Sequence, residues 1–161
     1  MSKGLTIIDK DYTQWVENLS VRYRQSQIKA AVRVNRELLK YYWELGRDIE
    51  EMHVEERWGQ SVIKNLSVDL QLKNPNSTGL SRTNIYYAKK FYLLYSQHLK
   101  VVPQTVGQLE EMLFSIPWGH HRYLMDRYSK EPAKALFYVR KTMEEGWSRD
   151  TLLNFMENGL V

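Results

Sequence analysis

The sequence predicts an all-α fold, a multi-helix domain with a long N-terminal helix and a helix-turn-helix or winged-helix-like core. Apolar residues recur with a helical period from Asp11 to about His53, a stretch whose only glycine is Gly46 and which has no proline. The 161 residues contain only four prolines and eight glycines, and most of these separate periodic segments. Helices joined by short loops therefore account for nearly the whole chain.

The first ten residues have no clear period, and we expect a flexible arm at 1–10 followed by a single helical domain at 11–161. The stretch from Asp11 to His53 predicts either one helix of about 40 residues or two helices broken between Ser20 and Ser26. Part of its apolar pattern repeats every 3.5 residues, which is typical of a seam between paired helices, and Asn35 would fix the register. The seam residues are Ile28, Val32, Asn35, Leu39, Tyr42, Gly46 and Ile49.

A helix, a polar turn and a second helix follow. The first helix is expected from Gln60 to about Leu72, the turn covers residues 73–79, and Ser81 is a good N-cap for a helix that continues through Tyr95. Val101-Val102 resembles a vestigial wing strand. Three further helices are expected: Thr105 to Phe114, a helix after His121 that reaches about Tyr128, and one from Pro132 to a C′ glycine at Gly146. Ser148 caps the last helix, which Gly159 closes.

The composition of the chain limits the classes of function that we expect. The net charge of +4 is mild, and it permits contact with phosphates without indicating it. There is no cysteine, so disulfides and thiol chemistry are excluded. The chain shows neither a signal peptide nor an apolar run long enough for a membrane span, and we expect a cytoplasmic protein that contacts no membrane.

The motifs of common enzymes are missing. Adjacent helical residues diverge by about 100°, so His120 and His121 are poor partners for one metal ion, and we expect no metal and no cofactor. The acidic cluster Glu50, Glu51, Glu55 and Glu56 is interpreted as a charged helix end. No Asp or Glu stands two residues before a Lys, as PD-(D/E)xK nucleases require. We therefore expect no catalytic residues and no enzyme activity in this chain.

Basic and aromatic residues indicate nucleic-acid binding as the leading hypothesis. No acidic residue occurs between Asp69 and Glu110, and the second helix of the pair is basic and aromatic. On the long helix, cations fall near one line, which would either follow a phosphate backbone or form an ordinary solvated face. The candidate DNA-binding residues are Ser81, Arg82, Asn84, Tyr87, Lys89 and Lys90 in the helix pair, and Arg22, Lys29, Arg33 and Arg36 in the long helix.

Several blocks occur in an order and spacing that resemble a known family. They are residues 34–46, 58–63 with 66–70, 79–85, 117–121 and 145–149. From about residue 12 the chain resembles the N-terminal domain of YhcG-type bacterial proteins. Trp58 stands where that family more often has Tyr, and the turn from Asn74 to Thr78 is slightly longer.

The resemblance implies a winged-helix-like DNA-binding module that precedes a PD-(D/E)xK nuclease domain. The expected function is a non-catalytic module that targets an associated nuclease domain, in cis or in trans, to duplex DNA. The alternative is a protein-interaction or dimerisation module of a nuclease system, with a homodimer formed through the long N-terminal helix.

Overall fold

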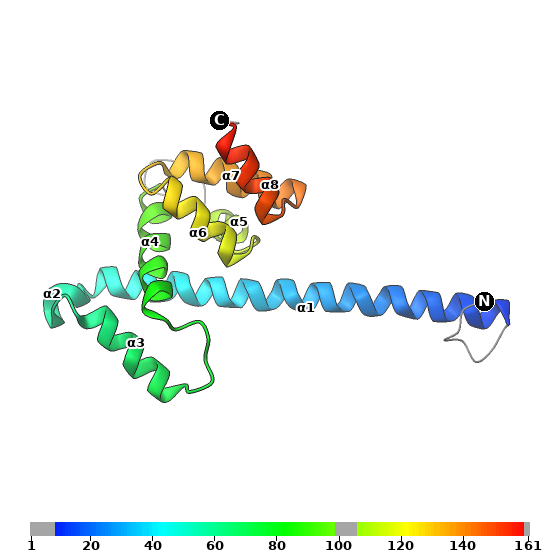
Figure 1. Ribbon diagram of the computed structural model, residues 1–161, viewed down its shortest axis with the longest axis horizontal. Coiled ribbons are helices and arrows are strands. Elements are labelled where there is room, and N and C mark those ends of the chain that lie inside the picture. The colour runs from blue at the N-terminus through cyan, green and yellow to red at the C-terminus, as the bar shows by residue number, and fades with distance from the viewer. Residues whose placement is uncertain (1–8, 99–105, 160–161) are drawn as a thin grey trace. The chain divides into compact units, whose positions relative to one another are not determined.

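The computed structural model describes residues 9–98 and 106–159, and every regular element in these ranges is an α-helix. The all-α prediction is therefore confirmed. In the described residues no helix combines the length and the apolar character needed to cross a membrane. The helices, labelled in Figure 1, are α1 (Lys10–Glu51), α2 (Val54–Trp58), α3 (Val62–Lys73), α4 (Arg82–His98), α5 (Val106–Leu113), α6 (Trp118–Arg127), α7 (Pro132–Glu145) and α8 (Arg149–Glu157).

The chain divides into two compact units, residues 1–34 and residues 35–161, which are described separately. The expectation of one domain over 11–161 stays a prediction. Helix α1 is continuous, so the first of the two alternatives for the long N-terminal segment is correct and there is no break between Ser20 and Ser26. Asp9 caps the helix, because its Oδ1 accepts from the backbone N–H of Asp11 at 2.7 Å and of Tyr12 at 3.3 Å.

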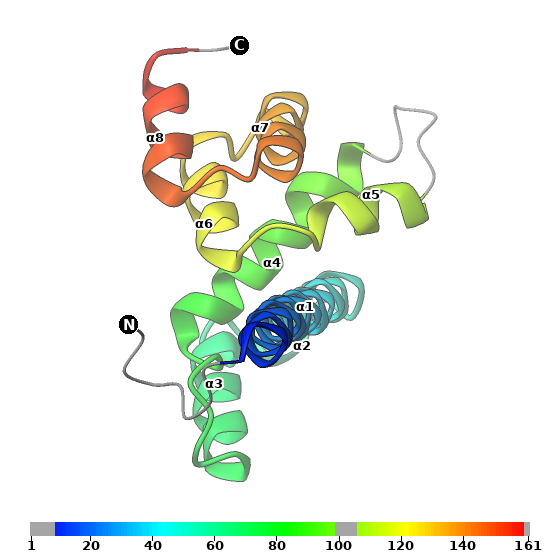
Figure 2. The ribbon, with the colours of Figure 1, turned by 90° about the vertical axis from the view of Figure 1, so that its right-hand side faces the viewer.

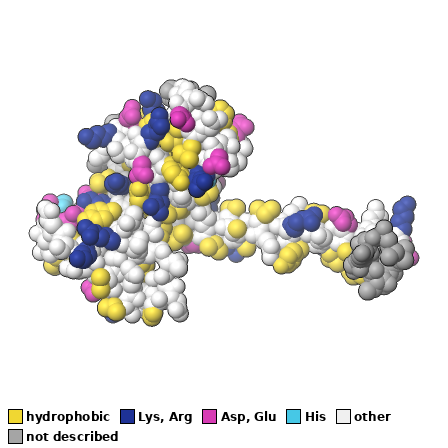
Figure 3. All heavy atoms as spheres, viewed as in Figure 1, with side chains coloured by type: hydrophobic (Ala, Val, Ile, Leu, Met, Phe, Trp, Pro, Cys, Tyr) yellow, Lys and Arg dark blue, Asp and Glu magenta, His cyan; other side chains and the backbone are white. Residues whose placement is uncertain are grey.

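In the first unit, the helix buries almost nothing. Every residue from Val21 to Val34 is exposed, including Tyr23 and Ile28, which are each 64% exposed. Figure 3 shows hydrophobic and basic side chains at the surface along this segment. An isolated helix gains most of its stability from packing an apolar face, and in the described residues the segment from Val21 to Val34 buries no such face.

In the second unit, α4 is the central helix. It contacts α3 on one side and α6 and α7 on the other, as Figure 2 shows. Phe91 of α4 is fully buried, and its ring lies 5.4 Å from Trp43 and 4.7 Å from His121 between centroids. Edge-on and tilted aromatic contacts of this kind add to the apolar burial of the core.

Gly46 allows a close approach between two helix backbones in this core. A Cβ atom at Gly46 would lie 2.1 Å from the carbonyl oxygen of Ala88 in α4 and 2.9 Å from Cβ of Tyr92. The hydrogen of glycine therefore sets the separation of α1 and α4 at their crossing. The sequence pattern did not assign this role to Gly46.

A smaller core cluster joins the end of α1 to α2, α3 and the start of α4. Ile49, Val54, Ile63 and Ile85 form its buried part. The short helix α2 was not predicted, and it follows His53, whose φ of 51° is left-handed. This cluster joins α3 to α4, and the two helices pack against each other. The helix-turn-helix or winged-helix-like core stays a prediction.

The turn between α3 and α4 is held from its inner side. Tyr42 donates its hydroxyl proton to the carbonyl of Gly79 at 2.7 Å, and Ser67 donates to the carbonyl of Leu80 at 2.7 Å. Ser81 is the N-cap as predicted, because its Oγ accepts from the backbone N–H of Asn84 at 3.1 Å. Val101-Val102, the suggested wing strand, lies outside the described residues.

Helices α5, α7 and α8 begin and end close to the predicted residues, whereas α6 begins at Trp118, before the predicted start after His121. Gly146 takes the left-handed conformation with φ of 65°, and Oγ of Ser148 accepts from the N–H of Thr151 at 3.3 Å. One prediction is wrong in part. The seam with Asn35 fails as a pairing surface over its second half, because Leu39 lies in the chain's own core and Asn35 donates to the carbonyl of Ile116 at 3.0 Å.

Candidate nucleic-acid interface

The first unit carries an open basic surface. Arg22, Lys29 and Arg33 line a shallow depression of about 520 Å³ together with small or uncharged residues, among them Gln25 and Ser26. None of the three cations forms an ion pair with any residue in the described part of the chain. We call Arg22, Lys29 and Arg33 the basic face, and its charges are free to meet an anion.

Arg36, the fourth cation predicted on this helix, lies in the second unit and has different surroundings. It is half-buried and lines a depression of about 500 Å³ that also contains Lys40 and the carboxylates of Glu37, Glu110 and Glu111. Acids contributed by α5 therefore compensate the positive charge there. Sequence spacing along α1 gave no sign of these two distant carboxylates.

At the start of α4, some predicted residues have exposed side chains and others are hydrogen-bonded within the protein. Ser81 and Arg82 are exposed, and the guanidinium of Arg82 lies 5.9 Å from the ring of Tyr86. Both polar atoms of the Asn84 amide are hydrogen-bonded within the protein. Its Nδ2 donates to the carbonyl of Gly79 at 3.4 Å, and its Oδ1 accepts from Nε1 of Trp118 at 3.2 Å. Asn84 would have to release Trp118 before it could contact a base.

Lys89 is likewise engaged within the second unit. Its ammonium forms a close ion pair with Glu55 and lies 3.8 Å from Glu50, and its side chain is only 23% exposed. Two members of the acidic cluster thus hold α4 against the α1–α2 corner. The interpretation of that cluster as a charged helix end missed this structural role, because the partner is 34 residues away from Glu55 in the sequence.

Tyr87 and Lys90 lie together on the exposed side of α4. The Tyr87 hydroxyl donates to Oδ1 of Asp126 at 2.7 Å, and its ring is flanked by Arg122 at 4.6 Å and Lys90 at 5.3 Å. The hydrogen bond to Asp126 raises the pKa of the Tyr87 phenol, with desolvation by burial second. The Tyr87 hydroxyl and ring therefore already contact groups of the protein itself, Asp126 and the two cations.

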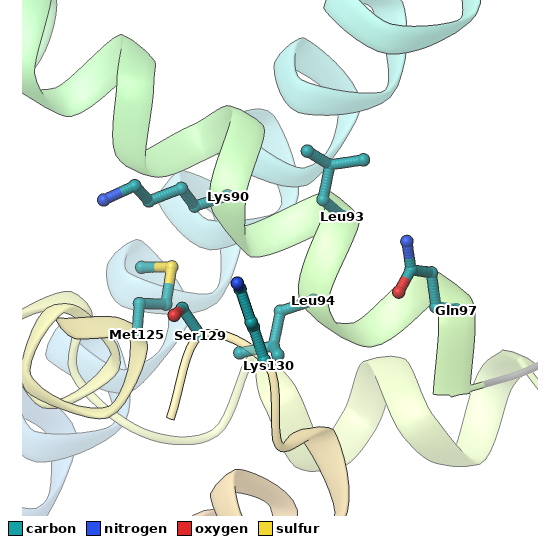
Figure 4. A pocket seen from close by; sticks show the side chains of 7 residues that line it. All are labelled: Lys90, Leu93, Leu94, Gln97, Met125, Ser129 and Lys130. Carbon is teal, nitrogen blue, oxygen red and sulfur yellow. The ribbon is translucent and has the colours of Figure 1, made fainter. Parts of the chain in front are cut away.

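A cleft of about 330 Å³ adjoins this cluster, between α4 and the loop that follows α6. In Figure 4 the Lys130 side chain extends into the cleft beside Leu94 of α4. Met125 and Ser129 lie next to each other, and Lys90 extends from α4. The sequence analysis singled out Lys90 but neither Arg122 nor Lys130. Those two come from α6 and its following loop, and no local pattern connects them to α4.

The two adjacent histidines are structural. Nε2 of His121 lies 2.6 Å from the carbonyl of Leu113, and Nε2 of His120 lies 2.9 Å from the carbonyl of Trp147. Burial lowers the pKa of His121 to about 4, so its ring is neutral at pH 7 and donates from Nε2. Among the residues that the structure describes, no group of three His, Asp or Glu side chains is placed to hold a metal ion.

The predicted site residues thus fall into four groups. The structure brings Arg22, Lys29 and Arg33 together in the first unit, and Tyr87 and Lys90 together in the second. Ser81 and Arg82 are exposed at the start of α4. The remaining predicted residues, Arg36, Asn84 and Lys89, lie beside or bind groups of the protein itself.

Comparison with models of protein families identifies the family of this chain. A family model described as the DUF1016 N-terminal domain matches residues 18–161. Its function is unknown, and in the DUF1016 family it precedes nuclease-type domains. No curated protein and no solved structure matches the chain.

Proposed function

Because the chain belongs to the DUF1016 N-terminal domain family, we propose that it is a non-catalytic module that binds duplex DNA and directs an associated nuclease domain to it. The observation that supports DNA binding best is the basic face, Arg22, Lys29 and Arg33, which is exposed and free of ion pairs in the described residues. The nuclease domain would act in cis or in trans.

The charge of the chain is concentrated in the first unit. Residues 1–34 contain six Lys and Arg and three Asp and Glu, so they carry +3 of the net charge of +4. No acidic residue occurs between Glu17 and Glu37. A local excess of cations without neighbouring acids attracts a polyanion and releases its counterions when it binds.

The spacing of the basic face suits a phosphate backbone. Lys29 and Arg33 follow Arg22 by 7 and 11 residues, so the three side chains point within about 20° of one line. They are separated along the helix axis by about 10 Å and 6 Å, at 1.5 Å per residue. Such contacts carry no sequence information, and we expect the basic face to supply affinity rather than base selectivity.

The second unit adds a candidate for further contacts. Tyr87, Lys90 and Arg122 form a cationic and aromatic cluster beside the cleft that Lys130 overhangs. With Ser81 and Arg82 also exposed, these residues are the ones we expect to contact DNA if α4 takes part. Base reading by Asn84 stays a prediction, and it requires the hydrogen bond from Trp118 to break.

The test is the salt dependence of binding to a labelled duplex. In a variant with Arg22, Lys29 and Arg33 all changed to Gln, three phosphate contacts are lost and helix propensity is nearly preserved. Fluorescence anisotropy from about 50 to 300 mM salt should show that the slope of log K against log[salt] flattens by about 2.7, at 0.9 per phosphate.

A matched control removes the same charge elsewhere. Lys134, Lys141 and Arg149 each form an ion pair with an acid one to four residues away, so changing all three to Gln lowers the net charge equally without touching the basic face. The control should keep the parent slope. If both variants flatten the slope equally, net charge and not the basic face governs binding, and no duplex binding by the parent at 50 mM salt would refute the proposal.

A further inference from the structure

The first unit has an apolar line besides its basic face. Tyr12 is followed by apolar residues at offsets of 4, 7, 11, 18 and 22, which lie within about 30° of one line on a helix. Leu19, Tyr23 and Val34 on this line are 40%, 64% and 68% exposed. We call it the apolar stripe, and its residues are Tyr12, Val16, Leu19, Tyr23, Ala30 and Val34.

The stripe is distinct from the other apolar residues of the segment. Ile28 and Val32 point almost to the opposite side of the helix and form a shorter patch, although both are more than half exposed. The basic face lies about a quarter turn from the stripe. The stripe therefore has cations along one of its edges.

The second unit has an apolar groove of about 310 Å³ between the end of α1, α2 and α3. Trp58 and Met52 line it and are 56% and 44% exposed, although both are large and apolar. Its walls and floor are otherwise Leu45, Ile49, Val54, Val62, Ile63 and Leu66, with Asn65 as an uncharged polar residue.

The groove's charged lining residues are both acidic. Asp48 and Asp69 are exposed, and among the described residues the carboxylate of Asp48 pairs with one cation, its sequence neighbour Arg47 at 4.0 Å. Asp69 has no ion pair in the described residues. An apolar helix with a basic edge complements this lining in both polarity and charge.

We propose that the α1–α2–α3 groove binds the apolar stripe of a second copy of this chain. Leu19, Tyr23 and neighbouring stripe residues cover Trp58 and Met52. The cations beside the stripe are those of the basic face, so they face Asp48 and Asp69 in the DNA-free dimer, and a bound duplex competes for them. The occupant is a second copy because every copy carries both surfaces. Two copies can then satisfy each other reciprocally, which is the self-complementary arrangement that closes a symmetric dimer.

The first measurement is sedimentation equilibrium of the DNA-free chain, whose monomer mass is 19.2 kDa. We expect a concentration-dependent dimer. Changing Tyr23 and Val34 to Ala removes two stripe contacts from each copy, and the dissociation constant should rise more than about a hundredfold, because both reciprocal contacts are lost. Changing Ile28 and Val32 to Ala removes comparable exposed apolar surface from the other side and should leave the dissociation constant within about threefold.

The groove is tested in the same way. Changing Trp58 and Met52 to Ala should weaken the dimer as strongly as the stripe variant does. The matched control changes Val68 and Leu72 to Ala, two exposed residues of α3 that do not line the groove. All of the changed side chains are at least 40% exposed, so we expect each variant to keep the parent fold. Circular dichroism and thermal melting check this.

Mixing the two deficient variants identifies the contact directly. The stripe variant retains an intact groove and the groove variant retains an intact stripe, so a mixture can form one of the two reciprocal contacts. We expect the mixture to give a heterodimer at concentrations where each variant alone is monomeric. A parent chain that stays monomeric at high concentration, equal weakening by the Ile28 and Val32 control, or a mixture without heterodimer would each overturn the proposal.

The two proposals can fail separately. Dimerisation is measured without DNA, and the salt slope is compared between variants at a protein concentration where sizing shows the same oligomer. Loss of the dimer with an unchanged DNA slope would overturn neither the basic face nor its phosphate contacts. A dimer without any DNA binding would support the groove and stripe alone.

Discussion

Replacing Gly46 with Ala tests how closely α1 and α4 approach in the second unit. On an exposed helical face this change is favourable by about 1 kcal/mol, because alanine loses less backbone entropy than glycine when a helix forms. At Gly46 the new Cβ would lie 2.1 Å from the carbonyl oxygen of Ala88, 2.8 Å from its carbonyl carbon and 2.9 Å from Cβ of Tyr92. The obstacles are backbone atoms and a Cβ, which cannot change rotamer to make room.

The two effects have opposite signs and the steric one is larger. Overpacking a tight core costs about 1 to 3 kcal/mol, and the higher end applies where two helix backbones must separate. Subtracting about 1 kcal/mol of helix propensity leaves a loss of about 2 kcal/mol in the free energy of unfolding. With about 2.1 cal/mol/K of unfolding entropy per residue, 1 kcal/mol corresponds to about 3 °C in a chain of this size, so Tm should fall by about 6 °C.

The assay is urea and thermal unfolding followed by circular dichroism, with Gly119→Ala as the matched control. Gly119 is also helical, but a Cβ there meets nothing within 4 Å. The control should be neutral or stabilising by up to about 1 kcal/mol. If Gly46→Ala is as stable as Gly119→Ala, the close α1–α4 crossing is wrong, and the position of α4 in the core has to be revised.

Three further substitutions probe the second unit. Lys89→Gln should lower the free energy of unfolding by about 1 to 3 kcal/mol in urea titrations, because it leaves the half-buried carboxylates of Glu50 and Glu55 unpaired. The control Lys90→Gln changes an exposed side chain and should alter the free energy of unfolding by less than about 0.5 kcal/mol. Equal effects of the two substitutions would contradict the pairing of Lys89 with these carboxylates. Tyr42→Phe should cost about 1 kcal/mol, because it removes the donor to the Gly79 carbonyl, and an unchanged urea midpoint would refute that role. The pKa of His121 is lowered to about 4 by burial, so the unfolded chain takes up a proton as pH falls below about 6.5 while the folded chain does not. The parent should therefore lose up to about 3 kcal/mol between pH 6.5 and pH 4, and His121→Gln should lack this part of the loss when both are unfolded across that range.

Local patterns in the sequence predict most of the helices and their ends. The N-cap at Ser148 and the left-handed glycine at Gly146 depend on residues within one turn of the chain, and both are observed. The helical period of α1 likewise places Leu39 and Tyr42 on the apolar side of the helix. It does not tell whether a second copy or the chain itself covers them, and the structure buries both in the second unit's own core.

The roles of charged and polar side chains depend on partners that are distant in sequence. Lys89 and Lys90 are adjacent and indistinguishable by pattern, yet only Lys89 meets Glu50 and Glu55, because the turn of about 100° between neighbouring helical residues aims the two side chains differently. Asn84 is similar, since only the packing of α6 beside α4 brings Trp118 to its amide.

The sequence by itself determined the helical class, several helix ends such as those at Ser81, Gly146 and Ser148, and the basic character of residues 18–36, because periodicity, capping and charge are local properties of the chain. The tertiary structure decided which cations stay free, which face of α4 is buried, and which apolar residues remain exposed as the stripe and the groove. Those outcomes follow from helix–helix packing, which brings together groups far apart in the sequence, such as the Asn35 amide and the backbone carbonyl of Ile116, 81 residues apart.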